Sequence, residues 1–135
     1  MAIVQTATNT FKTQLLNGGF NFTSSTFYIA LYTANATLNA DTTEYTSAGE
    51  VVASGYSALP LTVSTLPTSS NNVSFISFNN VTWTSALTAR GALIYKLGAN
   101  GAVCVLDFGS DKTSTSTFQV QFPAASSNSA IIRIN

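Results

Sequence analysis

The sequence has very little charge and no histidine. Only 7% of its 135 residues are charged, with five basic residues against five acidic ones, whereas a typical soluble domain has about 25%. Histidine is the usual general base beside a protein nucleophile and a common zinc ligand. We therefore expect no enzyme activity, no cofactor and no metal site.

Cysteine is also scarce, because Cys104 is the single one in the chain. It cannot form an internal disulfide, and it lies in the apolar run AVCVLDF. Two interpretations of this thiol were weighed, a buried structural side chain and a nucleophile. The nucleophile needs a base that this chain does not supply, so we expect a buried thiol.

Features that mark nucleic-acid and membrane partners are missing too. No stripe of Lys and Arg is present to contact phosphates. No apolar run approaches the about 20 residues that a helical membrane span requires. We expect neither nucleic acid nor a membrane as a partner.

The few acidic residues offer one pair for consideration, Asp107 and Asp111 in DFGSDK. They could bind calcium weakly together with backbone carbonyls, but calcium sites usually use more carboxylates than this. The favoured interpretation is an Asx-type turn flanked by solvated charges. Asp41 and Glu44 are likewise expected to be solvated surface residues.

In place of charge, the chain has hydroxyl groups, since Ser and Thr make up roughly a quarter of it. Soluble domains usually keep their net charge away from zero, and here it is zero. Surfaces that contact protein partners are depleted in Lys, Glu and Asp. We favour a protein that is packed among other subunits over an ordinary secreted β-domain with a polar surface.

One short helix is predicted near the start, over Thr8 to Gly19. Thr8 or Asn9 can cap it, and Phe11, Leu15 and Leu16 share one face. Asn17-Gly18-Gly19 supplies residues that tolerate the left-handed conformation found at helix ends. A helix this short needs support, so it must lie on a sheet or plug the open end of a sandwich.

After the helix, side chains alternate with the period of β-strands. In residues 26–33, Phe27, Ile29 and Leu31 point one way and three other uncharged residues point the other, so both faces are expected to be covered. Residues 34–57 read as a long polar excursion, with a short strand at 50–53. Further strands are predicted at 59–66, 73–78, 81–84, 89–97, 102–108, 115–122 and 130–134, with turns at 67–72 and 109–112.

This pattern of seven or eight strands predicts an all-β fold, an antiparallel β-sandwich that is jelly-roll-like, with one short N-terminal helix. The hairpin 89–108, joined by a Gly/Asn loop, is the strongest strand pair. We expect a single domain over 1–135. Residues 1–8 form a possible N-terminal arm, which either adds to a neighbour's sheet edge or frays.

Candidate interface residues follow from these expectations. In the arm they are Met1, Ala2, Ile3 and Val4. In the long excursion, Tyr45 and Tyr56 have no obvious core role, and tyrosine is enriched at protein interfaces. Exposed aromatic side chains also serve as sugar-binding platforms, so that use stays open.

Several segments together resemble a family of small virion proteins encoded by tailed phages. They are FKTQLLNGGFNFTSSTFYIALYTANATL, EVVASGYSALPLTV, VTWTSALTARGALIY, VLDFGSDK and FQVQFPAASSNSAIIRIN. The resemblance covers almost the whole chain, and it implies a likeness to capsid cement or decoration proteins with a jelly-roll or related sandwich fold. No catalytic residue carries over.

The resemblance implies a place on the virion, most simply the outer surface of the capsid. There the chain would bind across major capsid protein subunits, as a homo-oligomer such as a dimer or trimer, and stabilise the shell. The alternatives are a tail, collar or fibre component, and a carbohydrate-binding module for host adsorption.

Overall fold

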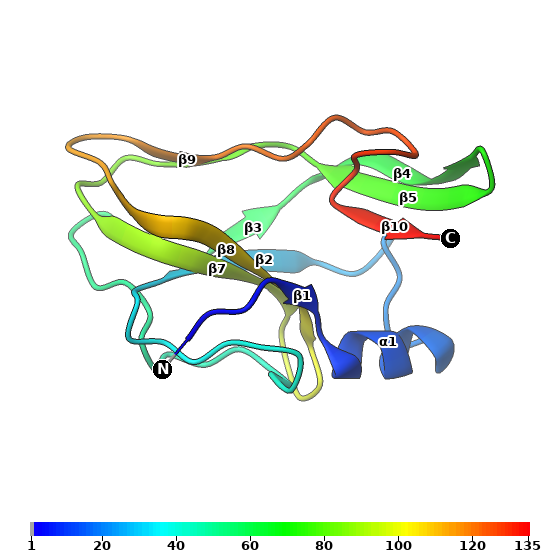
Figure 1. Cartoon of the computed structure of the whole chain (residues 1–135), viewed down its shortest axis with the longest axis horizontal. Coiled ribbons are helices and arrows are strands. Elements are labelled where there is room, and N and C mark those ends of the chain that lie inside the picture. The colour runs from blue at the N-terminus through cyan, green and yellow to red at the C-terminus, as the bar shows by residue number, and fades with distance from the viewer. Residues whose placement is uncertain (1) are drawn as a thin grey trace.

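The computed structural model describes residues 2–135, which fold into antiparallel sheets and one helix (Figure 1). The elements in chain order are β1 (Thr6–Ala7), α1 (Asn9–Leu16), β2 (Phe27–Tyr32), β3 (Leu59–Leu61), β4 (Val63–Ser70), β5 (Val73–Phe78), β6 (Val81–Trp83), β7 (Thr88–Lys96), β8 (Ala102–Thr113), β9 (Phe118–Val120) and β10 (Ile132–Ile134). The predicted all-β sandwich with one short N-terminal helix is confirmed.

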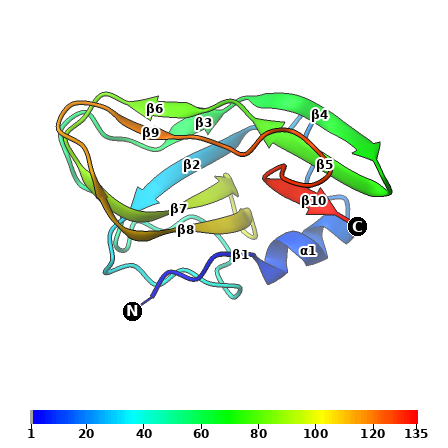
Figure 2. The same ribbon diagram turned by 45° about the horizontal axis from the view of Figure 1, so that its top comes forward.

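The larger sheet has five strands in the order β1-β8-β7-β2-β3. The second layer consists of a three-stranded sheet, β10-β5-β4, and a two-stranded sheet, β6-β9. These two parts are continuous along the chain, because β5 leads into β6 after Asn79-Asn80, and β9 returns beside β6 before β10 pairs with β5 (Figure 2). The alternation of side chains in the sequence predicts where the strands lie but not their order in the sheets.

The main core lies between the two layers. Alternate residues of β2, Phe27, Ile29 and Leu31, face it, and they are at most 1% exposed. The single tryptophan, Trp83, is buried there and donates its indole N–H to the Ser57 carbonyl at 2.7 Å. A cluster of phenylalanines extends this core toward α1, with rings of Phe11, Phe20 and Phe22 in contact.

The opposite face of the five-stranded sheet is also buried, as the sequence predicts for β2. Ala30, Tyr32 and Leu93 lie on this face and are fully buried. Two segments cover them: residues 33–58, which form the long excursion between β2 and β3, and the N-terminal segment. Leu38 of the excursion and Ile3 of the N-terminal segment pack in the same cluster. A sheet with both faces covered explains why its strands lack the polar alternation of a half-exposed sheet.

Two parts of the excursion approach each other closely at a glycine. Gly49 has a φ of +79°, and a Cβ atom added there would lie 2.6 Å from the Cα of Ala36. The predicted strand at 50–53 is reduced to a single bridge between Glu50 and Tyr32.

Helix α1 is shorter than the predicted span but begins where its cap predicts. Thr8 adopts an extended conformation, and its side-chain oxygen accepts a hydrogen bond from the Phe11 N–H. Asn17 ends the helix and Gly18 follows with a φ of +76°. The helix packs beside β8 and buries Phe11 at one end of the sandwich, which is one of the two predicted placements.

Several predicted boundaries are wrong. The strand expected at 59–66 is two strands, β3 and β4, which belong to different sheets, and the strand expected at 130–134 covers only β10. The turn expected at 67–72 is confined to Asn71-Asn72, because β4 continues through Pro67 as an edge strand. The turn expected at 109–112 is absent, since β8 runs to Thr113 with Gly109 at a φ of +84°. The strand expected at 115–122 covers only β9, because its partner β6 has three residues.

No helix in the described residues is long and apolar enough to cross a membrane.

Candidate functional site

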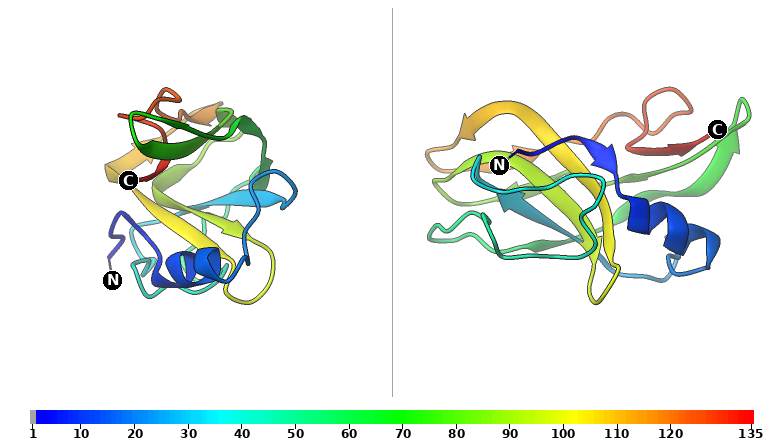
Figure 3. Two further views of the ribbon diagram at one scale, coloured as in Figure 1. Left: turned by 90° about the vertical axis from the view of Figure 1, so that its right-hand side faces the viewer. Right: turned by 60° about the horizontal axis from the view of Figure 1, so that its bottom comes forward.

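The N-terminal segment pairs with its own chain. This segment runs beside the excursion (Figure 3). Ile3 is buried and forms a parallel bridge with Leu38, and the Val4 N–H donates to the Leu38 carbonyl at 2.9 Å. Beyond it, β1 pairs with β8. The arm predicted over residues 1–8 is therefore not free over residues 2–8, because burial of Ile3 and these backbone hydrogen bonds hold it. Met1 lies outside the described residues.

Of the arm residues predicted as interface candidates, Ala2 and Val4 stay accessible. Ala2 is exposed, and Val4 is 52% exposed because its side chain points away from the bridge. Ile3, in contrast, is part of the cluster that covers the outer face of the sheet.

Glu50 brings the two predicted loop tyrosines together. The Tyr45 hydroxyl donates to Glu50 Oε1, and the Tyr56 hydroxyl donates to Glu50 Oε2 at 2.7 Å. The Tyr56 oxygen also accepts from the Leu31 N–H at 2.8 Å. Glu50 therefore ties the excursion to β2, and Tyr56 satisfies a backbone donor that the short strand β3 does not reach.

All five tyrosines of the chain contribute to this region, which we call the tyrosine cluster: Tyr28, Tyr32, Tyr45, Tyr56 and Tyr95. The rings of Tyr45 and Tyr95 have centroids 4.9 Å apart, and those of Tyr28 and Tyr95 are 5.8 Å apart. The Tyr32 hydroxyl donates to the Thr46 carbonyl at 2.6 Å. The cluster thus joins the outer face of the sheet to the loop that covers it.

Tyr45, Tyr56 and Tyr95 have phenols whose pKa values are raised above the ordinary value. The hydrogen bond to Glu50 raises the pKa of Tyr45 to about 12. Burial raises the pKa of Tyr95 to about 12, and burial likewise raises the pKa of Tyr56. Tyr45 and Tyr56 are therefore two neutral hydrogen-bond donors to one carboxylate, that of Glu50.

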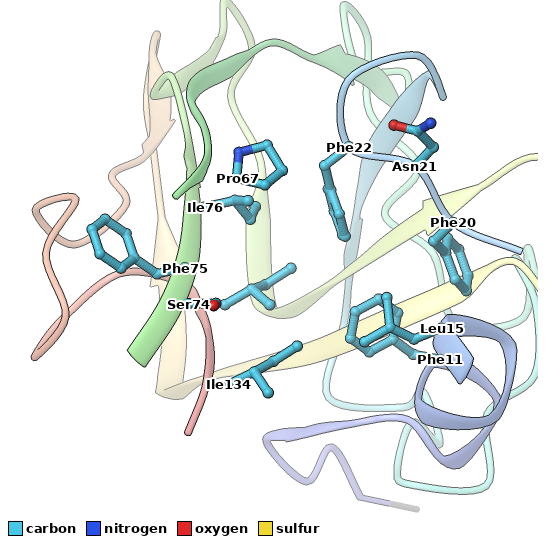
Figure 4. Close-up of a pocket in the computed structure, with 11 residues that line it drawn as sticks. Phe11, Leu15, Phe20, Asn21, Phe22, Pro67, Ser74, Phe75, Ile76 and Ile134 are labelled. Carbon is cyan, nitrogen blue, oxygen red and sulfur yellow. The ribbon is translucent and has the colours of Figure 1, made fainter. Parts of the chain in front are cut away.

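An apolar groove lies at the end of the sandwich where α1 approaches β10, and we call it the α1–β10 groove. Its narrower part encloses about 280 Å³ between two walls (Figure 4). One wall is α1 and the segment after it, with Leu15, Phe20 and Phe22. The other is β4, β5 and β10, with Ile76 and Ile134. A wider part of about 610 Å³ adjoins it and shares Phe11, Leu15, Ile132 and Ile134.

The rim of the groove is apolar and accessible. Leu16, at the end of α1, is 90% exposed, and Ile134 is 50% exposed. Both line the wider part, where Lys12 and Arg133 are the charged lining residues. The groove therefore offers shape and apolar surface for contact with another molecule.

Sequence reasoning missed this groove. It depends on α1 and β10, which lie at opposite ends of the sequence, and on an unpaired edge of β10. The signals in the sequence were the predicted apolar helix face of Phe11, Leu15 and Leu16, of which Leu16 is in fact 90% exposed, and the isoleucines of AIIRI.

The remaining chemical candidates are structural. Cys104 is buried, as predicted, and burial raises the pKa of its thiol to about 12. Asp107 forms the predicted Asx-type turn, because its carboxylate accepts from the Gly109 N–H at 2.8 Å and from Arg90 at 3.2 Å. These two contacts lower the pKa of Asp107. Within residues 2–135, no three His, Cys, Asp or Glu side chains are grouped as metal ligands would be.

Comparison with known proteins gives no match: no family model, no curated protein and no solved structure is significantly similar to this chain.

Proposed function

We propose that this chain is a structural component of a phage virion, a capsid cement or decoration protein that binds across major capsid protein subunits. The sequence resemblance described above suggests the virion. The low charge and the hydroxyl-rich surface are consistent with a protein that is surrounded by other subunits.

The observation that carries the proposal is the α1–β10 groove with its accessible rim. Leu16 and Ile134 expose apolar surface beside a groove with phenylalanine on one wall and β-branched side chains on the other. Large exposed apolar side chains next to an apolar recess are typical of a surface that is covered in an assembly. A capsid subunit is the partner that we propose for it.

Such a protein acts by mass action. A molecule that binds the assembled shell better than free subunits stabilises the shell, by an amount that grows with its concentration relative to its dissociation constant. If it is a dimer or trimer, as we propose, each contact raises the effective concentration of the next. No catalytic step is needed for this role.

The test is binding to shells assembled from the major capsid protein encoded by the same phage. Leu16→Asp places a charge where apolar surface is to be buried, and we expect it to lower the affinity about tenfold or more. Leu97→Asp is the matched control, because Leu97 is 63% exposed on the β7–β8 hairpin, outside the groove. Equal effects of both substitutions would contradict the proposed role of the groove.

A reconstruction of the source particle separates the proposal from its alternatives. Density repeated over the shell and touching two or more capsid subunits would support the cement role. Density restricted to the tail, collar or fibres would overturn it and favour those locations.

A further inference from the structure

Within the tyrosine cluster, Tyr45 and Tyr95 meet the geometric requirements of an oxidative cross-link. Their ring centroids are 4.9 Å apart with an angle of 31° between the ring planes. The two residues are far apart in sequence, since Tyr45 is in the excursion and Tyr95 is in β7.

Tyr45 is also positioned to lose an electron first. It is 37% exposed, so an oxidant can reach it, whereas Tyr95 is 3% exposed beneath it. Its hydroxyl donates to Glu50 Oε1. When an electron leaves the phenol, its proton can pass to this carboxylate, which is already within hydrogen-bonding distance.

We infer that Tyr45 and Tyr95 form a site of intramolecular dityrosine formation, with a haem peroxidase and hydrogen peroxide as the one-electron oxidant system. Each phenol loses one electron and its phenolic proton, from Tyr45 to Glu50 and from Tyr95 to solvent. The ring carbons next to the two oxygens then join. The hydrogens on those carbons return to the oxygens, and the peroxide takes up two electrons and two protons to become two waters.

The product has a structural consequence that is separate from the proposed virion role. It bonds the excursion covalently to β7, across the buried outer face of the five-stranded sheet. Closing this long loop restricts the unfolded chain, so the cross-linked protein is expected to unfold at a higher temperature than the untreated protein.

The experiment treats the full chain, at low concentration, with a haem peroxidase and hydrogen peroxide. The monomer is isolated and digested with trypsin and a Glu-specific protease. Tyr95 is then the single tyrosine of peptide 91–96, and Tyr45 is the single tyrosine of peptide 45–50. The expected product is these two peptides joined, with the mass of their sum less two hydrogens.

Other products are distinguished by the same digest. Peptide 91–96 joined to 13–44 would indicate Tyr28 or Tyr32, and joined to 51–90 it would indicate Tyr56. Either as the main product, or cross-links formed between molecules alone, would overturn the inference.

Three variants sharpen the test. Tyr45→Phe is expected to abolish the 45–50 product, while Tyr28→Phe removes the phenol of the other tyrosine beside Tyr95 and is expected to leave the product intact. Glu50→Gln keeps a similar shape but is no longer a base, so the initial rate of cross-linking is expected to fall several-fold. An unchanged rate would contradict the role of Glu50 as proton acceptor, and circular dichroism checks that each variant is folded.

Discussion

At the scale of single residues, Tyr56 shows how one hydroxyl can serve two elements. It donates to Glu50 and accepts from the N–H of Leu31, which is buried in β2. A buried backbone donor without a partner costs about 1–3 kcal/mol. The value of this hydroxyl to the fold therefore depends on Leu31 more than on Glu50.

Replacement of Tyr56 by Phe tests this dependence. We expect the free energy of unfolding to fall by about 1–3 kcal/mol, measured by urea denaturation, because the Leu31 N–H loses its acceptor. Tyr45→Phe is the matched control. Its hydroxyl bonds Glu50 alone and at the surface, so a loss of under about 1 kcal/mol is expected. A larger loss for Tyr45→Phe than for Tyr56→Phe would contradict this account.

At the scale of elements, helix α1 depends on its cap. Thr8 is fully buried, its hydroxyl oxygen accepts from the Phe11 N–H at 3.0 Å, and the same hydroxyl donates to the Ala102 carbonyl at 2.9 Å. The side chain therefore sets both where the helix begins and how it docks on β8.

Thr8→Ala removes both hydrogen bonds, and we expect it to lower the free energy of unfolding by about 2 kcal/mol. The control is Thr10→Ala in the same helix turn, where the hydroxyl contacts only exposed Asn100; a change within about 0.5 kcal/mol is expected. Urea denaturation measures the free energy of unfolding of both variants. Equal losses would mean that the cap is not what holds the helix.

The elements also show what sequence can predict. The cap at Thr8, the alternation in β2 and the β7–β8 hairpin are local patterns, and they were predicted correctly. The sequence predicts turns at Pro67 and Gly109, and both predictions are wrong. Pro67 lies in an edge strand, and Gly109 lies where the pairing of β8 with β7 shifts register, so a strand tolerates each residue there. Partner strands are a property of the tertiary structure, which local patterns do not contain.

For the candidate sites too, the sequence predicts single residues but not the tertiary contacts between them. Tyr45 and Tyr56 were identified singly, as aromatic residues in a polar loop. Their meeting at Glu50 was not predicted, because it depends on how the excursion returns to β2. The α1–β10 groove was missed for the same reason, since its walls come from segments that are remote in the sequence.

The edge strands of the sheets are protected against pairing with other chains. Each outer strand carries a feature that discourages pairing with another chain: β1 has two residues, β6 and β9 have three each, β3 contains Pro60, β4 contains Pro67, and β10 contains Arg133. Prolines, charges and short length are the usual means of protecting sheet edges. We therefore expect partners to bind through side chains at the groove rather than by extending a sheet.

At the scale of the whole molecule, alkaline pH is expected to destabilise the fold. The pKa of Cys104 rises from 9.0 to about 12, and those of Tyr45 and Tyr95 rise from 10.0 to about 12. Above pH 9 the unfolded chain releases protons that the folded chain keeps. Because the unfolded state then binds fewer protons, the free energy of unfolding decreases as pH rises, over the window from about 9 to 12.

The measurement is the urea midpoint at a series of pH values from neutral upward. A plateau near pH 7 to 8 is expected, followed by a steady fall from pH 9. Cys104→Ala serves as the comparison, since its stability is expected to fall less steeply between pH 9 and 10. A midpoint that does not change between pH 7 and 11 would contradict the effect.

The pairing of β1 with β8 has a kinetic consequence. Thr6 lies opposite Val105, so this edge of the five-stranded sheet closes only after residue 105 has been made. Contacts between residues so distant in sequence slow folding, because the chain must lose the entropy of a long loop before they form. A nascent chain that ends before β8 would therefore leave this side of the core open on the ribosome.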